Sequence, residues 1–137
     1  MNLLIDTNVL LDVLAHRQPH FEASLKIWRL CETNAAHGFV SVLSFANIVY
    51  IQRKNLSPES VRELWNKLES VFSFVDLTAE DMSNATKNQG KDFEDTLQAV
   101  TAVRLRADYI ITRNKQDFVQ CKIPCLAPTE LCGLFAV

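Results

Sequence analysis

Carboxylate and amide side chains are the groups in this sequence that could do chemistry together. Carboxylates without a neighbouring imidazole or thiol suit a hard cation, because Mg²⁺ and Mn²⁺ prefer oxygen ligands. A cation held between such acids and a phosphodiester lowers the pKa of a water and offsets the charge that builds on the phosphate. The pattern therefore predicts metal-assisted hydrolysis of a phosphodiester. The candidates, which fall in four separated segments, are Asp6, Asn8, Asn47, Asp92, Glu94, Asp95, Thr112, Asn114 and Asp117.

Each acid also has a purely structural interpretation. Asp6 could cap a helix that begins near Thr7, and the pair Asp92 and Asp95 resembles a capping box with both acids favoured by the helix dipole. Asp117 could be an ordinary turn residue. Helix capping explains each acid separately, but it does not explain why the acids recur at the same kind of position with few basic partners.

Five short apolar runs and the amphipathic segments between them define the elements that must position these side chains. The continuous runs 3–5, 39–42, 72–75 and 109–111, with a weaker fifth at 125–127, predict strands covered on both faces. Helical periodicity marks the segments 19–31, 44–52, 58–72, 78–87 and 92–106. Strands that alternate with helices predict an α/β fold, a short parallel sheet of about five strands with helices on both faces.

The candidate residues follow these strands or begin the helices after them. In a parallel sheet the carboxyl end of each strand and the start of the next helix lie at one edge, where ligands bind. Asp6 directly follows the first strand, and Asp95 lies in the first turn of the helix 92–106. We therefore expect the four segments to bring their oxygen atoms to a single site.

Length and composition indicate one globular domain over residues 1–137. The formal net charge of −2 gives no overall field toward nucleic acid, so such a partner would have to meet a local basic patch. We expect no signal peptide or membrane segment, and a cytoplasmic protein. The four cysteines show no zinc-finger spacing, which favours reduced thiols, although Cys121 and Cys125 could hold a metal or a disulfide.

Four stretches with this order and spacing carry a family resemblance. They are Leu4-Ile5-Asp6-Thr7-Asn8-Val9-Leu10-Leu11-Asp12, Ser41-x-x-Ser44-x-x-Asn47, Asp92-Phe93-Glu94-Asp95-Thr96-Leu97-Gln98 and Ala107-Asp108-Tyr109-Ile110-Ile111-Thr112-Arg113-Asn114-x-x-Asp117-Phe118. On these stretches the chain resembles the PIN domain family, and more closely the VapC-type toxins. The resemblance implies a Rossmann-like PIN fold and a Mg²⁺- or Mn²⁺-dependent ribonuclease, the toxin of a toxin–antitoxin pair.

The resemblance also implies a role for each candidate. Asp6 and Asp95 would be catalytic and metal-binding acids, and the late acid would be Asp117, with Asn114 as its polar neighbour or its alternative. Asn8 would orient Asp6 or a metal-bound water. The remaining supporting residues would be Asn47, Asp92, Glu94 and Thr112.

Asn47 is a departure from the family pattern, because PIN nucleases commonly carry glutamate there. An amide oxygen can contact a metal or a water, but it brings no charge and cannot act as a base. Three outcomes are open: Glu94 or Asp92 compensates, the site holds one ion rather than two, or the activity has decayed.

The expected partners are RNA, an antitoxin protein and a second copy of the chain. Arg113, Lys115 and Lys91 flank the acids and could contact RNA phosphates, although solvated surface charge explains them equally well. Single-stranded RNA is favoured over duplex because its backbone can bend into a cleft. An excess of apolar side chains favours a homodimer or antitoxin surface, with core packing as the rival explanation; they are Phe21, Leu25, Trp28, Leu64, Trp65 and Leu68.

Three classes of function fit the sequence. The first is a metal-dependent ribonuclease toxin. The second is a catalytically inactive PIN module that binds RNA or a protein, and Asn47 is its best support. The third is an unrelated acid-lined α/β domain such as a phosphatase or receiver. Asp6-Thr7-Asn8 lacks the second aspartate that the phosphatase type needs, and Val42-Leu43 lacks the aspartate that a receiver needs.

Overall fold

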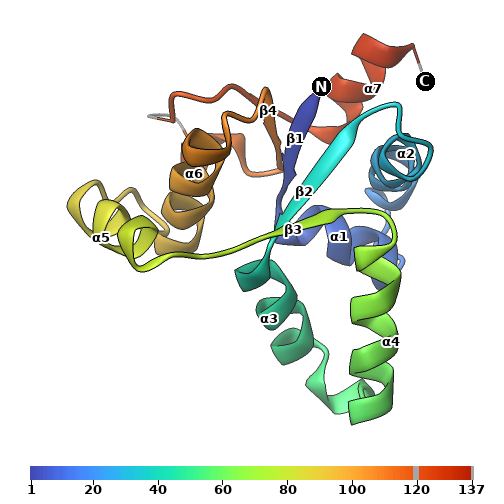
Figure 1. The fold of residues 1–137 in the computed structure, drawn as a ribbon. Helices are drawn as coiled ribbons and strands as arrows, with labels where there is room; N and C mark the ends of the chain where they lie inside the picture. The colour runs from blue at the N-terminus through green and yellow to red at the C-terminus, as the bar shows by residue number, and fades with distance from the viewer. Residues whose placement is uncertain (119–120, 137) are drawn as a thin grey trace.

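A five-stranded parallel sheet forms the centre of the molecule, in the order β3-β2-β1-β4-β5 (Figure 1). The computed structural model describes residues 1–118 and 121–136, so 119–120 and 137 of the expected domain 1–137 lie outside the described residues. The strands are β1 (Asn2–Ile5), β2 (His37–Ser41), β3 (Ser73–Val75), β4 (Tyr109–Ile111) and β5 (Cys125–Leu126). The α/β class and the five strands are confirmed.

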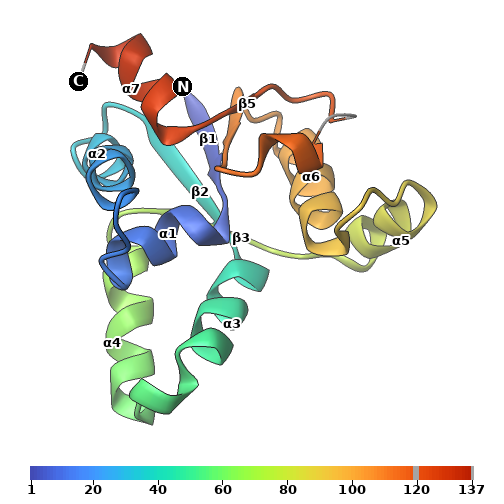
Figure 2. The ribbon, with the colours of Figure 1, turned by 180° about the vertical axis from the view of Figure 1, so that it is seen from behind.

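Helices cover both faces of the sheet. They are α1 (Thr7–Leu14), α2 (Phe21–Glu32), α3 (Val42–Ile51), α4 (Pro58–Glu69), α5 (Ala79–Lys87), α6 (Phe93–Leu105) and α7 (Pro128–Phe135), with single 3₁₀ turns at η1 (Arg53–Asn55) and η2 (Lys115–Phe118). Helix α6 packs on one face and carries α5 on its outside, whereas α2 and α7 pack together on the other. Seen from either side, α3 and α4 project beyond the end of the sheet (Figures 1 and 2).

Alternation along the strands divides the core into two layers. Leu3 and Ile5, both fully buried, belong to the cluster under α1, α2 and α7. Leu4 points to the opposite face and joins Ile110 and Phe118 under α6. This is the period of two expected for a strand that is covered on both sides. The burial fixes the register of β1 and therefore the position of the residue that follows it.

Two predicted boundaries were wrong for local reasons, and one helix was not predicted. Strand β2 ends at Ser41, because the Ser41 hydroxyl accepts a hydrogen bond from Leu43 N (3.2 Å) and starts α3 at Val42. Phe72 lies in neither a helix nor a strand, and its ring packs edge-on against Trp28 (centroids 5.1 Å apart). Helix α7 was not predicted, although Pro128 occupies its first turn.

The apolar side chains proposed for a dimer or antitoxin surface pack largely within the chain. Trp28 and Leu68 are buried, and Trp65 stacks on Phe74 with ring centroids 4.0 Å apart. None of the six proposed residues, all of which the structure describes, is among the exposed large apolar side chains. Core packing therefore accounts for most of that apolar excess.

The four cysteines are free thiols, as favoured by the sequence. Cys31 and Cys132 are buried, and burial raises the pKa of Cys31 to about 12. Within residues 1–118 and 121–136, no helix is both long enough and apolar enough to cross a membrane.

Candidate active site

Asp6 lies at the carboxyl end of β1 and is nearly fully buried, at 4% exposure. Its backbone N–H continues the sheet by donating to Ile111 O (3.0 Å). One carboxylate oxygen accepts from Thr7 N (2.9 Å), which is the predicted helix cap, and the other accepts from the Thr112 hydroxyl (2.9 Å). Asp6 is therefore held by β4 and the residue that follows it, as well as by α1.

The start of α6 supplies two acids in different environments. The Asp92 carboxylate caps the helix by accepting from Asp95 N (3.1 Å). The reciprocal bond of a full capping box does not form among these described residues, because the Asp95 carboxylate does not return to the Asp92 backbone. Asp95 is 9% exposed, and its carboxylate is left to face the cavity described below.

The segment after β4 brings a third group of polar atoms. The Thr112 hydroxyl, which donates to Asp6, also accepts from Asn114 N (3.0 Å). Asn114 O in turn accepts from Asp117 N (3.0 Å) and closes the η2 turn. Asp117 thereby lies in the same cavity as Asp95 and is close enough to raise the pKa of the Asp95 carboxyl.

Asn47 reaches the site from α3. Its amide nitrogen donates to Glu94 Oε1 (2.8 Å) across 47 positions of sequence. Asn47, at the position where the resemblance leads us to expect a glutamate, thus holds a glutamate of α6 beside it. This geometry favours Glu94, of the two acids considered, as the carboxylate nearest to Asn47.

These side chains surround one cavity of about 210 Å³. Every candidate from the sequence except Thr112 lines it, and Thr112 stands behind Asp6. The lining residues are Asp6, Thr7, Asn8, Asn47, Tyr50, Ile51, Asp92, Glu94, Asp95, Asn114 and Asp117. The structure therefore brings together acids from three distant segments and the Asn47 amide from a fourth.

The donor set of this cavity fits a hard divalent cation. Its polar lining consists of carboxylate, amide, hydroxyl and phenol groups, and the described lining contains neither an imidazole nor a thiol. Over the described part of the chain, no three acidic, histidine or cysteine side chains already form a compact ligand group. Mg²⁺ is commonly bound through only one or two carboxylates with water and phosphate oxygens, so the acids here suffice.

Burial and mutual repulsion change how these acids titrate. Burial raises the pKa of Asp6 above its ordinary value, and the hydrogen bonds from Thr112 and Thr7 oppose that rise. The pKa of Asp95 rises to about 7, first because the group is buried and then because Asp6, Asp92 and Asp117 lie close to it. A cluster of like charges at buried positions favours binding of a proton or a cation.

The three basic residues assigned to RNA differ in their surroundings. Arg113 donates twice to the buried Asp12 (2.9 and 3.1 Å), and Lys115 pairs with Glu130 (2.7 Å). Lys91 is exposed. The contact of these residues with RNA stays a prediction.

Sequence reasoning missed several residues that shape the site. Tyr50 and Ile51 line the cavity from the end of α3, and no local pattern distinguishes them from core residues. Beneath Thr7, the Ser44 hydroxyl accepts from Thr7 Oγ1 (2.8 Å) and from Gln98 Nε2 (2.9 Å). Both Ser44 and Gln98 lie in the stretches that carry the family resemblance. That resemblance is the signal that could have assigned them to the site.

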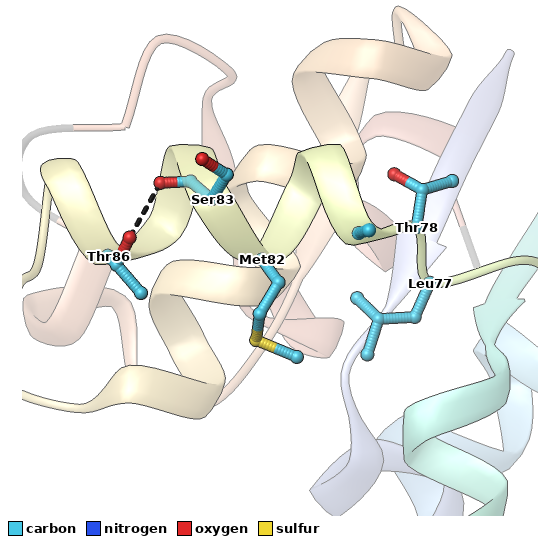
Figure 3. Close-up of a pocket in the computed structure, with 6 residues that line it drawn as sticks. Leu77, Thr78, Met82, Ser83 and Thr86 are labelled. Carbon is cyan, nitrogen blue, oxygen red and sulfur yellow. Dashed lines mark hydrogen bonds between the residues drawn. The ribbon is translucent and has the colours of Figure 1, made fainter.

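A larger cavity of about 390 Å³ lies elsewhere, on α5 (Figure 3). Leu77 and Met82 line it together with hydroxyl residues, and the Thr86 hydroxyl is turned inward to Ser83 O (2.7 Å). Its described lining contains no ionisable side chain. Its size therefore does not make it the better candidate for chemistry.

Comparison with known proteins agrees with the fold. A family model described as PIN domain matches residues 2–116. No curated protein sequence matches the chain.

Solved structures with the same fold come from toxin–antitoxin complexes. A complex from Klebsiella pneumoniae is 19% identical over 92% of this chain and 97% of that one, with a TM-score of 0.68. VapBC2 from Rickettsia felis, bound to a DNA fragment from its promoter, is 17% identical (93% and 98% covered, TM-score 0.67). VapBC-1 from nontypeable Haemophilus influenzae is 15% identical (94% and 99% covered, TM-score 0.69). At these identities the likeness establishes the fold.

Proposed function

Because this chain belongs to the PIN domain family, we propose that it is a Mg²⁺- or Mn²⁺-dependent endoribonuclease and the toxin of a toxin–antitoxin pair. The observation that supports the proposal most is the convergence of five carboxylates on one cavity; they are Asp6, Asp92, Glu94, Asp95 and Asp117. Family membership sets aside the phosphatase and receiver alternatives. An antitoxin is a proposed partner, since the similar structure from Klebsiella pneumoniae is a toxin–antitoxin complex. A second copy of the chain is proposed from the family resemblance.

The acids would divide the work by their positions. Asp6, Asp95 and Asp117 would hold the cation, because they come from three elements and face the same cavity. When bound, the cation supplies a more acidic water and neutralises charge on the phosphodiester. Thr112 fixes one oxygen of Asp6, and Asn47 fixes Glu94 at the rim. Asn8 is oriented by Arg17, which donates to its side-chain oxygen (3.3 Å).

Cleavage of single-stranded RNA by purified protein tests this function. We expect cleavage with Mn²⁺ or Mg²⁺ and none with a chelator. Asp6→Asn and Asp95→Asn should each lower the rate at least ~100-fold, because each removes one charge that holds the cation. Glu63→Gln is the matched control, since Glu63 is an exposed acid of α4 that does not line the cavity. Equal rates for Asp95→Asn and the wild type would remove Asp95 from the site.

A catalytically inactive PIN module is the second candidate, and Asn47 is the observation that favours it. The amide brings no charge, and it occupies Glu94 with a hydrogen bond. This candidate predicts RNA or protein binding without metal-stimulated cleavage. Asn47→Glu should then create or increase cleavage, whereas in an active enzyme the same change should have a small effect.

A further inference from the structure

Two exposed apolar side chains lie on the rim of the acidic cavity. Tyr50 and Ile51 are 65% and 51% exposed, and they are the last two residues of α3. The proposed metal chemistry uses neither of them. Large apolar side chains in contact with water at a functional cavity call for an explanation.

The helical repeat explains why Tyr50 leaves the core. Ile48 is fully buried, and Phe45 packs edge-on against Trp65 and Phe74 (centroids 5.0 and 5.9 Å). At about 100° per residue, Tyr50 is turned some 200° from Ile48 and so points away from that packing. The rotation of α3 that buries Phe45 and Ile48 therefore also exposes Tyr50.

Arg53 holds the Tyr50 ring in place from one side. Its guanidinium carbon lies 4.1 Å from the ring centroid, and its Nη1 donates to Tyr50 O (2.7 Å). A cation on one face restrains the ring. The 65% exposure of Tyr50 shows that much of its surface is still accessible to a flat ligand. Arg53 and its neighbour Lys54 are both exposed and bring positive charge to the rim of a cavity whose interior is acidic.

A nucleobase matches this arrangement better than the other candidate occupants. The base is flat and uncharged, so it can bind beside carboxylates that repel its phosphates, and Arg53 can contact the adjoining backbone. A stable interface between copies buries about 800 Å² on each partner, which is far more than two side chains supply. The other large exposed apolar side chains of the described residues lie on different elements or at the N-terminus; they are Met1, Met82, Phe93, Val103 and Leu134.

We propose that Tyr50 is a stacking platform for an unpaired base of single-stranded RNA, next to the phosphodiester at the acidic cavity. This rests on the proposed ribonuclease function and narrows its substrate to RNA in which a base is free to leave its neighbours. Bases in duplex RNA are already stacked and paired, so they are not free to stack on Tyr50. The proposal therefore excludes duplex RNA as a substrate.

Steady-state cleavage and equilibrium binding of a labelled single-stranded RNA test the proposal. Tyr50→Ala should raise KM about 5- to 100-fold, the equivalent of about 1–3 kcal/mol, and change kcat less than about threefold. Tyr50→Phe and Tyr50→Trp should keep KM near the wild-type value, because stacking needs the ring and not the hydroxyl. Leu134→Ala removes a comparably exposed apolar side chain from α7 and serves as the control.

Fluorescence gives a direct readout of stacking. In Tyr50→Trp, RNA should quench the new indole. In the wild type the emission of Trp28 and Trp65 should not change, since Trp28 is buried and Trp65 packs against Phe45 and Phe74. An unchanged KM for Tyr50→Ala, or equal losses for Tyr50→Ala and Tyr50→Phe, would overturn the proposal. A dimer that becomes a monomer in Tyr50→Ala, measured by light scattering, would assign this rim to a second copy instead.

The two proposals can fail separately. If the wild type cleaves no RNA with Mn²⁺ or Mg²⁺, the ribonuclease function fails. Fluorescence anisotropy of the same RNA then tests Tyr50 alone, and equal binding by wild type and Tyr50→Ala, including no binding by either, overturns the stacking platform.

Discussion

Several acids of this site accept a hydrogen bond that stabilises the fold and also line the cavity. Asp6 caps α1 and is fixed by Thr112, yet it still lines the cavity. A carboxylate has about four lone-pair positions, so one hydrogen bond to each oxygen leaves room for another ligand. Asp95 differs, because its backbone N–H and not its carboxylate takes part in the cap. Among the described residues no hydrogen-bond donor reaches its carboxylate, so its charge is left uncompensated.

The raised pKa of Asp95 predicts a pH-dependent stability. The folded pKa is about 7, whereas that of the unfolded chain is about 4, so between these values only the folded chain holds the proton. The free energy of unfolding of the wild type therefore falls as pH rises from about 4 to 7. Asp95→Asn removes this loss of stability. In the presence of a chelator at pH 8, the free energy of unfolding of the variant should exceed that of the wild type by up to about 4 kcal/mol.

Urea unfolding at pH 5 and pH 8 checks this prediction. The difference between Asp95→Asn and the wild type should be small at pH 5 and large at pH 8. Asp76→Asn, an exposed acid outside the cavity, should show no such growth. A difference that is the same at both pH values would show that Asp95 is ionised normally in the fold.

The sequence predicted the positions of the acids better than it predicted which side chains surround them. That Asp6 and Asp95 meet at one cavity was predictable, because strand ends and helix starts share one edge of a parallel sheet. The bond from Asn47 to Glu94 was not, since it depends on how α3 lies relative to α6. Tyr50 was missed for a related reason: its exposure depends on the rotation of α3, which Phe45 and Ile48 set through contacts distant in sequence.

Among the elements, α6 has acids of the candidate site at its start and a left-handed residue other than glycine at its end. Arg106 has a left-handed backbone (φ 55°), and two bonds close the helix there. Ala107 N donates to Ala102 O (3.0 Å) and Arg106 N donates to Val103 O (3.1 Å), which is the Schellman pattern. Glycine is the usual residue at that position because it lacks a Cβ.

Arg106→Gly should therefore stabilise the protein by about 1 kcal/mol, because the left-handed conformation is costly for a residue with a Cβ. Arg106 is exposed, so its side chain contributes little packing. Thermal or urea unfolding measures the gain. Arg106→Ala is the control, since it removes the charge but keeps the Cβ. An equal gain in both variants would attribute the effect to charge.

Element boundaries show where local patterns are insufficient. Strand β4 was placed correctly at 109–111, because its apolar run is buried on both faces. Helix α7 was missed because it is only eight residues long, and its contacts with α2 decide its structure more than its own periodicity. Ser41 ended β2 one residue early because a side-chain cap outweighs the β propensity of Val42.

At the scale of the whole molecule, folding itself creates the proposed cation site. Asp6 and Asp117 are separated by most of the chain, and they meet because β1 and β4 are paired, with Ile5 opposite Ile111. In the unfolded chain these carboxylates are far apart, so a divalent cation should bind the folded state in strong preference. Binding of that kind raises the free energy of unfolding by RT ln(1 + [L]/Kd).

Mn²⁺ at a hundredfold excess over its Kd should therefore stabilise the wild type by about 2.7 kcal/mol, a rise in Tm of roughly 10 °C for a domain of this size. Asp117→Asn should reduce this rise in Tm. Asp95→Asn should reduce it most, because the substitution removes the negative charge that repels the neighbouring acids and attracts the cation. K⁺ at matched ionic strength separates binding from general screening of the acidic cavity. A Tm that responds equally to K⁺ and Mn²⁺ would show that the converging acids repel one another without selecting a divalent ion.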